Sequence, residues 1–153
     1  MGRIGSFNVK GLKEFQNKLN RLQDPDEFVE SCAKELAARL LAKVIKRTPV
    51  GQYSKESGKM GGTLRRGWTG GKRASAQTYA KSLNIQHVDD TYIIEIINPV
   101  EYASYVEYGH RTANHKGWVM GQFMMTISEQ ELETIAPKVL ENKIKKYLKG
   151  CMK

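Results

Sequence analysis

The chain has few of the residues and motifs that would point to a metal, disulfide or membrane protein. Its 153 residues include two cysteines, Cys32 and Cys151, which are far apart in the sequence. No cysteine pair has metal-ligand spacing, and we expect no disulfide in a reducing compartment. No apolar run approaches the roughly 20 residues that a membrane helix needs, so we expect no membrane contact. The first residues lack the apolar core of a signal peptide, which indicates a cytosolic origin.

Signatures of catalysis are also scarce. The only histidines are His87, His110 and His115, and the last two lie in a predicted loop without neighbouring Cys or Asp ligands. The chain has no complete phosphate-binding loop and no nucleophile elbow. A hairpin turn explains Asp89-Asp90 as well as a nuclease pair does. The sequence therefore predicts that the protein is not an enzyme and that it binds no cofactor and no metal.

Acidic residues are almost missing between Lys43 and Lys81. This stretch holds ten Lys or Arg residues against one acid, Glu56, which accounts for the entire net charge of +9. It also holds seven of the fourteen glycines. Long segments without their own core are usually functional or disordered, so residues 50–73 are predicted to form an extended basic loop that orders on assembly. The predicted contact residues of this loop are Tyr53, Lys55, Lys59, Leu64, Arg65, Arg66, Trp68, Lys72 and Arg73.

Two kinds of partner fit such a loop. Its cations could meet an acidic protein surface. They could equally meet DNA phosphates, with Trp68 and Tyr79 as stacking platforms for bases. The cations are spread along a glycine-rich loop instead of a groove-entering helix, which favours the protein partner. DNA binding through residues 50–81 is the alternative function, and an ordinary solvated loop is the third interpretation.

Hydrophobic periodicity predicts helices at both ends of the chain and strands between them. The long first helix has an N-cap and capping-box signal in Asp24-Pro25-Asp26-Glu27 and a stop at Thr48-Pro49. The last helix has a possible capping box at Ser128 and a predicted kink or break at Pro137. The expected elements are helices over 10–22 and 24–48, strands over 63–69, 78–88 and 92–97, a helix over 99–108, a basic loop over 110–120, and a helix from 124 or 128 to 149.

This order predicts an α+β fold in one domain, residues 1–153. A long N-terminal helix and a C-terminal helix are expected to pack on a small antiparallel sheet, and residues 150–153 to form a flexible tail. Gly109 is expected to cap the helix before it. One of Tyr102 and Tyr105 is expected in the core, and Glu107 is expected to pair with Arg111 locally or to fix register between subunits.

Three ordered segments resemble a known family. The first joins the end of the long helix, Thr48-Pro49-Val50-Gly51, to Gly62-Thr63-Leu64-Arg65-Arg66-Gly67-Trp68 after a loop. The second, after Asn98-Pro99, is Tyr102-Ala103-x-x-Val106-Glu107-x-Gly109, and the third is Gly121-x-Phe123-Met124. Together they resemble the small minor tail component family of long-tailed bacteriophages, which includes tail-completion and neck proteins of prophages and phage-tail-like particles. The family-motif residues are Pro49, Gly51, Tyr102, Val106, Glu107, Gly109 and Phe123.

The resemblance implies a non-enzymatic virion protein with an α+β fold, assembled in the host bacterial cytoplasm. It implies a ring at the head–tail junction, six-fold by preference, that joins the head–tail connector to the tail terminator or tail tube. It also suggests that the loop after the long helix lies at subunit or ring-to-ring contacts. In a neck ring the same loop could face channel DNA. A toxin or nuclease of a mobile element is a further, weaker alternative.

Overall fold

The structure is a computed structural model, and it describes residues 25–151. The expected helix over 10–22 and the Asp24 cap lie outside this range. The described chain combines helices with small antiparallel sheets, so the predicted α+β class is confirmed. In chain order the elements are α2 (Pro25–Arg47), the 3-10 turn η1 (Lys55–Ser57), α3 (Thr63–Gly67), α4 (Ala76–Ser82), β1 (Ile85–Val88), β2 (Thr91–Ile94), α5 (Ala103–Tyr108), β3 (Gly109–Arg111), β4 (Trp118–Met120) and α6 (Met124–Cys151).

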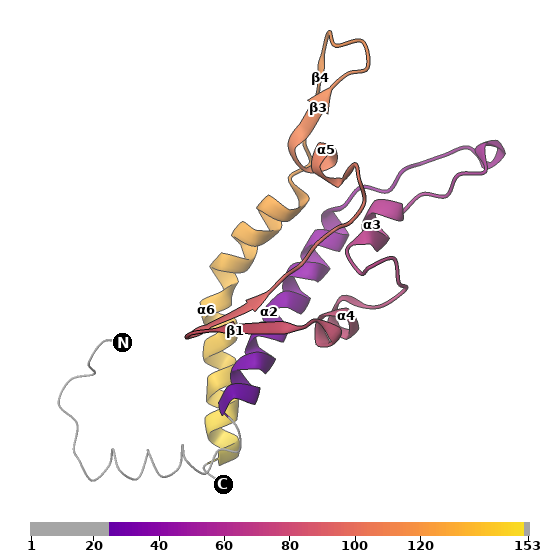
Figure 1. The fold of residues 1–153 in the computed structure, drawn as a ribbon. Helices are drawn as coiled ribbons and strands as arrows, with labels where there is room; N and C mark the ends of the chain where they lie inside the picture. The colour runs from indigo at the N-terminus through magenta and orange to yellow at the C-terminus, as the bar shows by residue number, and fades with distance from the viewer. Residues whose placement is uncertain (1–24, 152–153) are drawn as a thin grey trace, which may run out of the picture.

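Helices α2 and α6 lie side by side and run in opposite directions (Figure 1). Late in α2, Lys43 Nζ lies 3.1 Å from a carboxylate oxygen of Glu131, early in α6. Early in α2, Glu35 Oε2 lies 2.8 Å from Nζ of Lys143, late in α6. These pairs are partly exposed, so they fix the register of the two helices more than they stabilise them. The stability comes mainly from the apolar face of α2, which lies against its neighbours.

The core lies where the C-terminal half of α2 meets α3, α4 and the first turn of α6. Its buried apolar side chains are Ala37, Leu41, Val44, Leu64, Trp68, Ala80 and Met124. Thr48, fully buried at the end of α2, accepts a hydrogen bond from Trp68 Nε1 at 2.8 Å. The same hydroxyl donates to the Val44 carbonyl oxygen at 2.6 Å. Thr48 therefore ends α2 and also anchors the segment that follows the next loop.

The predicted strand over 63–69 is wrong, because this segment is helix α3. Leu64 and Trp68 are four residues apart, a spacing that brings both to one side of a helix and also to one side of a strand. Contact with α2 decides in favour of the helix. A Cβ on Gly67 would lie 2.2 Å from Asn98 Oδ1, so the glycine allows Asn98 to approach and donate from Nδ2 to the Leu64 carbonyl at 2.8 Å.

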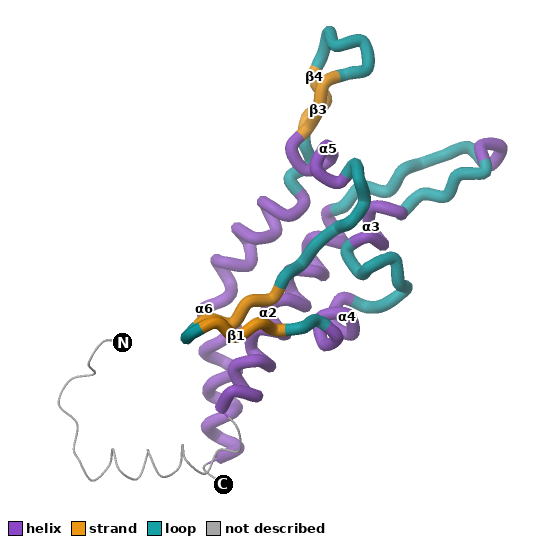
Figure 2. Tube along the Cα trace, in the orientation of Figure 1, coloured by secondary structure: helices purple, strands orange, loops and turns teal. Residues whose placement is uncertain are grey.

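The predicted single sheet is two separate two-stranded sheets (Figure 2). Much of the expected strand over 78–88 is helix α4, capped by Ser75, whose Oγ accepts from the Thr78 backbone N–H at 3.1 Å. The first sheet pairs β1 with β2, joined at the expected Asp89-Asp90 turn, and contacts α2. The second sheet pairs β3 with β4, where the sequence predicted only a loop over 110–120.

Helix α6 differs from the sequence prediction in three ways. It begins at Met124, so Ser128 lies inside it, fully buried, and donates from Oγ to the Met124 carbonyl at 2.5 Å instead of forming a capping box. It runs through Pro137 as one element to Cys151. Gly150 and Cys151, expected in a flexible tail, are therefore helical. The predicted loop over 50–73 is also not one segment, because α3 occupies 63–67.

Candidate functional site

Two segments project from one end of the molecule (Figures 1 and 2). The first, residues 49–62, is called the arm. The second is the β3–β4 hairpin, residues 109–120, and helix α5 lies between the two segments. We call the surface formed by these three parts, together with Tyr102 at the start of α5, the projecting end. It contains most of the residues that the sequence singled out.

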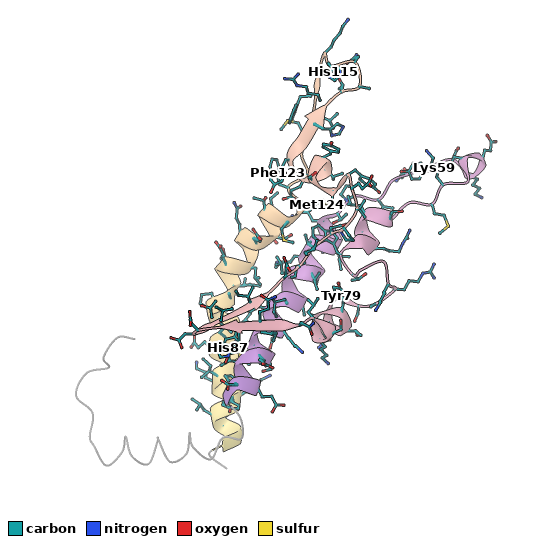
Figure 3. All side chains as sticks on the ribbon, viewed as in Figure 1. Lys59, Tyr79, His87, His115, Phe123 and Met124 are labelled. Atoms are coloured by element: carbon teal, nitrogen blue, oxygen red, sulfur yellow. The ribbon has the colours of Figure 1, made fainter. Side chains whose placement is uncertain are left out.

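Two glycines close the base of the arm. A Cβ on Gly61 would lie 2.0 Å from the Gly51 carbonyl oxygen, so the outgoing and returning chains touch there. Residues 51–60 are all exposed, and their one regular element is the turn η1. Lys59, labelled in Figure 3, has its Nζ 5.8 Å from the centre of the Tyr53 ring, near the outer limit of a cation–π contact. The arm therefore leaves its side chains available to a partner.

The structure sorts the predicted arm residues into three groups. Leu64 and Trp68 are each 5% exposed, so they are core residues and not contact residues. Arg65 and Arg66 are half-buried and donate to backbone carbonyls near the base of the arm, at 2.7 and 3.3 Å. The predicted contact residues that remain exposed are Tyr53, Lys55, Lys59, Lys72 and Arg73.

This sorting weakens the DNA interpretation. Its main stacking platform, Trp68, is buried and hydrogen-bonded. Its second platform, Tyr79, lies on α4 and packs against the core (Figure 3). Arg65 and Arg66 are engaged with backbone oxygens of the same chain. Neither Trp68 nor Tyr79 is thus an exposed platform for a base, and fewer cations are free to meet phosphates. A protein partner is therefore the better match for the basic segment.

Glu107 has a role that the sequence did not reveal. Its side chain is buried, and its carboxylate accepts hydrogen bonds from the backbone N–H groups of Met125 and Thr126, each at 2.9 Å. Thr126 Oγ1 donates to the same carboxylate at 2.8 Å. Glu107 therefore caps the N-terminus of α6, where the helix dipole favours a negative charge. The expected ion pair with Arg111 is replaced by this cap.

The remaining motif residues shape the base of the β3–β4 hairpin. Gly109 has a φ of +88°, and a Cβ there would lie 2.5 Å from the Val119 carbonyl oxygen. A Cβ on Gly121 would lie 2.4 Å from the Glu107 carbonyl oxygen, so the hairpin also leaves and returns through two glycines in close contact with its base. Phe123, with a φ of +47°, then turns the chain into α6. Its backbone N–H donates to the same Glu107 carbonyl at 3.0 Å.

Large apolar side chains are exposed over the projecting end. Tyr102 and Tyr105 are both exposed, so the expectation that one of them lies in the core is wrong. Trp118 is 58% and Met120 is 72% exposed. The exposed large apolar residues of the projecting end are Val50, Tyr53, Met60, Tyr102, Tyr105, Tyr108, Trp118, Val119 and Met120. Large exposed apolar surfaces on soluble proteins usually serve an interaction.

A shallow groove lies at the base of the arm. It has a volume of about 220 Å³, and α5 contributes one of its walls. Pro49 and Gly51, two of the motif residues, lie on the arm side, and Tyr102 and Val106 lie on the other side. Val106 is half-buried and packs against the core, so it joins this groove to the body of the protein.

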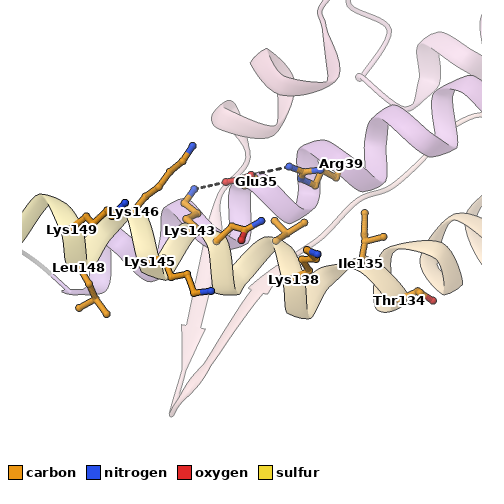
Figure 4. A pocket seen from close by; sticks show the side chains of 12 residues that line it. Glu35, Arg39, Thr134, Ile135, Lys138, Lys143, Lys145, Lys146, Leu148 and Lys149 are labelled. Atoms are coloured by element: carbon orange, nitrogen blue, oxygen red, sulfur yellow. Dashed lines mark hydrogen bonds and ion pairs between the residues drawn. The ribbon is translucent and has the colours of Figure 1, made fainter.

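A larger hollow lies along α2 and α6, away from the projecting end (Figure 4). It has a volume of about 950 Å³ and is lined mainly by residues of α6, five of which are lysines. Glu35 pairs here with Lys143 and Arg39, and the hydrogen bond from Lys143 holds the pKa of Glu35 below its ordinary value. Nowhere in residues 25–151 do three potential metal ligands gather. None of the helices described is long and apolar enough to cross a membrane.

Comparison with known proteins identifies a family. A family model described as "Bacteriophage HK97-gp10, putative tail-component" matches residues 13–109, which is more than half of the chain. The match includes the arm, α5 and the first residue of β3, and it ends before the Gly121-x-Phe123-Met124 segment. Neither a curated protein nor a solved structure matches the chain. The chain therefore belongs to the HK97-gp10-like family of phage tail components.

Proposed function

We propose that the protein is a structural, non-enzymatic virion component that forms a closed ring at the head–tail junction. In this position it joins the head–tail connector to the tail terminator or tail tube. The family match supports a structural role in a phage tail. The six-fold symmetry that we favour comes from the resemblance noted in the sequence.

The observation that carries this proposal is the projecting end. Its exposed large apolar side chains are mostly Tyr, Trp and Met, the residue types enriched at the centres of protein interfaces. They lie on two segments that leave the body of the protein instead of covering its core. A protein that acts alone gains nothing from such a surface, whereas one that joins other proteins needs it.

The arm is assigned to the contact between neighbouring rings. It projects from the body of the protein, and its exposed cations suit an acidic protein surface. Its extended conformation has few contacts with its own chain beyond the glycine base, so a partner would complete its packing. In a neck ring the same cations could also face DNA in the channel.

A deletion of residues 52–60 tests the proposal directly. It removes the exposed part of the arm and joins Gly51 to Gly61, which are already in contact, so the protein should fold with nearly unchanged stability. In a phage that carries this gene, we expect filled heads and finished tails that remain separate in electron micrographs. Lys138→Ser, in the hollow of Figure 4, is the matched control and should give normal particles. Normal particles from the deletion would show that the arm is dispensable for joining.

Removal of the whole gene tests the function apart from the arm. Infectious, joined particles without the protein would refute the head–tail role. The DNA alternative predicts instead that the purified protein binds duplex DNA with a steep salt dependence. No binding at low salt would eliminate it. Capsid and portal genes on one side of this gene and tail-tube genes on the other would independently support the proposal.

A further inference from the structure

We propose that the β3–β4 hairpin of one copy docks on the outer face of the β1–β2 sheet of the next copy in the ring. The inference rests on the proposed ring and identifies the surfaces through which its subunits meet. Both surfaces lie outside the arm, which leaves the arm free for the contact between rings. The occupant of the outer sheet face is therefore a second copy of this chain.

The hairpin is built as a contact element and not as part of a core. Its strands have three residues each, and an isolated two-stranded sheet of this size is at best marginally stable in water. All of β4 is exposed, including Trp118 and Met120. Tyr105 and Tyr108 of α5 add exposed rings beside the base of the hairpin. Burial against a partner would stabilise both the hairpin and these side chains.

The outer face of the β1–β2 sheet is the complementary surface. Along β2 and the residues after it, Tyr92, Ile94 and Ile96 are half-buried, whereas the alternating positions are exposed. Antiparallel sheets with one solvated face usually carry polar residues on that face. Here Ile93 is 43% and Ile97 is 57% exposed. Within the described chain this strip of large apolar side chains has no cover.

The charges of the two surfaces are opposite. Residues 109–120 contain Arg111 and Lys116 and no acid. Residues 85–97 contain three acids and no Lys or Arg. All three acids are exposed, and Glu95 lies between the exposed Ile93 and Ile97, just after the end of β2. Each surface therefore has an apolar centre and a rim of one sign, the arrangement that gives orientation and specificity to an interface.

The two surfaces are separate on one molecule. In Figure 3, His115 marks the tip of the hairpin and His87 marks the β1–β2 sheet, and the two labels lie toward different ends of the long helices. The hairpin therefore does not reach the sheet of its own chain. Two different complementary patches on each copy make a head-to-tail contact, which closes into a ring when the rotation between copies allows it.

Paired charge reversals test the contact in the purified full chain. Arg111→Glu with Lys116→Glu alters the hairpin, and Asp90→Lys with Glu95→Lys alters the sheet face. Asp89 is left unchanged because its φ of +53° suits Asp in the turn. We expect each pair to weaken self-association about 10-fold or more, as measured by sedimentation velocity, because like charges then face each other. The matched controls are Lys138→Glu with Lys146→Glu and Glu129→Lys with Glu133→Lys, exposed positions on α6 that should leave self-association unchanged.

Mixing the variants distinguishes a head-to-tail contact from any other. The hairpin variant keeps its sheet face, which already carries the native acids, and the sheet variant keeps its native hairpin. A mixture should therefore associate again in one-to-one alternation, because each native hairpin meets a native sheet face and each reversed hairpin meets a reversed one. Both pairs of reversals in one chain should also restore association. If the mixture stays monomeric, or if the controls weaken association equally, the proposed pairing is wrong.

Cross-linking in assembled particles provides a second readout that does not depend on association in solution. In a Cys151→Ser background, Lys116→Cys and Glu95→Cys should give a ladder of disulfide-linked multimers. Links confined within single chains, or no links at all, would overturn the inference. The proposed function would survive that outcome if loss of the gene still left heads and tails unjoined. Joined particles without the gene would instead refute the function itself.

Discussion

Replacing Glu107 should destabilise the protein far more than its position on a short surface helix suggests. Glu107 is 7% exposed, and its carboxylate accepts three hydrogen bonds from the first turn of α6. Loss of an N-cap costs about 0.5–2 kcal/mol. Leaving a buried N–H group without a partner adds about 1–3 kcal/mol.

From these terms we expect Glu107→Ala to lower the free energy of unfolding by about 2–4 kcal/mol. Glu107→Gln keeps one acceptor oxygen but removes the charge that complements the helix dipole, so a smaller loss of about 1–2 kcal/mol is expected. Urea denaturation followed by circular dichroism measures both values. The melting temperature should fall by about 2–4 °C for each kcal/mol in a chain of this length.

Glu101→Ala is the control, because Glu101 is exposed and lies just before α5, the helix that contains Glu107. It should change the free energy of unfolding by less than about 0.5 kcal/mol. If Glu107→Ala matched this control, the carboxylate would not be the cap of α6, and the reasoning about the motif would fail. If Glu107→Gln were as damaging as Glu107→Ala, the charge and not the shape of the side chain would dominate the site.

Three further outcomes follow from the core, the ion pairs and the glycines. Trp68→Phe should lower the free energy of unfolding by about 1–3 kcal/mol, because it leaves a gap in the core and removes the donor to the buried Thr48 hydroxyl. When Thr48→Val is combined with it, the two losses measured by urea titration should add to less than their sum. Hydrogen bonds from Lys43 and Arg47 hold the pKa of Glu131 below its ordinary value of 4.5. The ionised Glu131 therefore stabilises the folded protein fully above pH 4.5, and this contribution is lost as the pH falls through the lowered pKa. Glu131→Gln should therefore be less stable than wild type near pH 7 and equally stable in strong acid, and a constant difference across pH would contradict this. Gly121→Ala should unfold at lower temperature than Gly117→Ala, because its Cβ would lie 2.4 Å from a backbone oxygen of α5, whereas the nearest atom at Gly117 is 3.4 Å away.

The long helices could be predicted because their signals are local. The proline of Asp24-Pro25 and the stop at Thr48-Pro49 lie in the sequence itself, and α2 spans the residues between them. The apolar period of α6 likewise predicted its existence, although it left the start open between 124 and 128. Met124 begins the helix because Glu107 caps it from another element, and no local pattern reveals a cap that lies 18 residues away.

The parts that could not be predicted depend on contacts between distant residues. Leu64 and Trp68 fit a strand or a helix equally well, and burial against α2 selects the helix. The β3–β4 hairpin lacks the Asn-Gly turn signal and has very short strands, so its sequence reads as a loop. For the site, the sequence singled out the glycine-rich segment after the long helix, and residues 51–60 of that segment are exposed in the structure. The sequence could not show that Arg65 and Trp68 belong to the body while Tyr53 and Lys59 stay exposed.

The glycine contacts at the bases of the arm and the hairpin have an evolutionary consequence. Gly61 against Gly51, and Gly121 against the end of α5, fix where each segment leaves and re-enters the body. Residues beyond these points can change in number and type without disturbing the helices. The arm and the hairpin can thus vary in sequence while the helices that support them stay the same. Phages that recombine their structural genes could fit the same scaffold to a new neighbour by replacing the tip of the arm or of the hairpin alone.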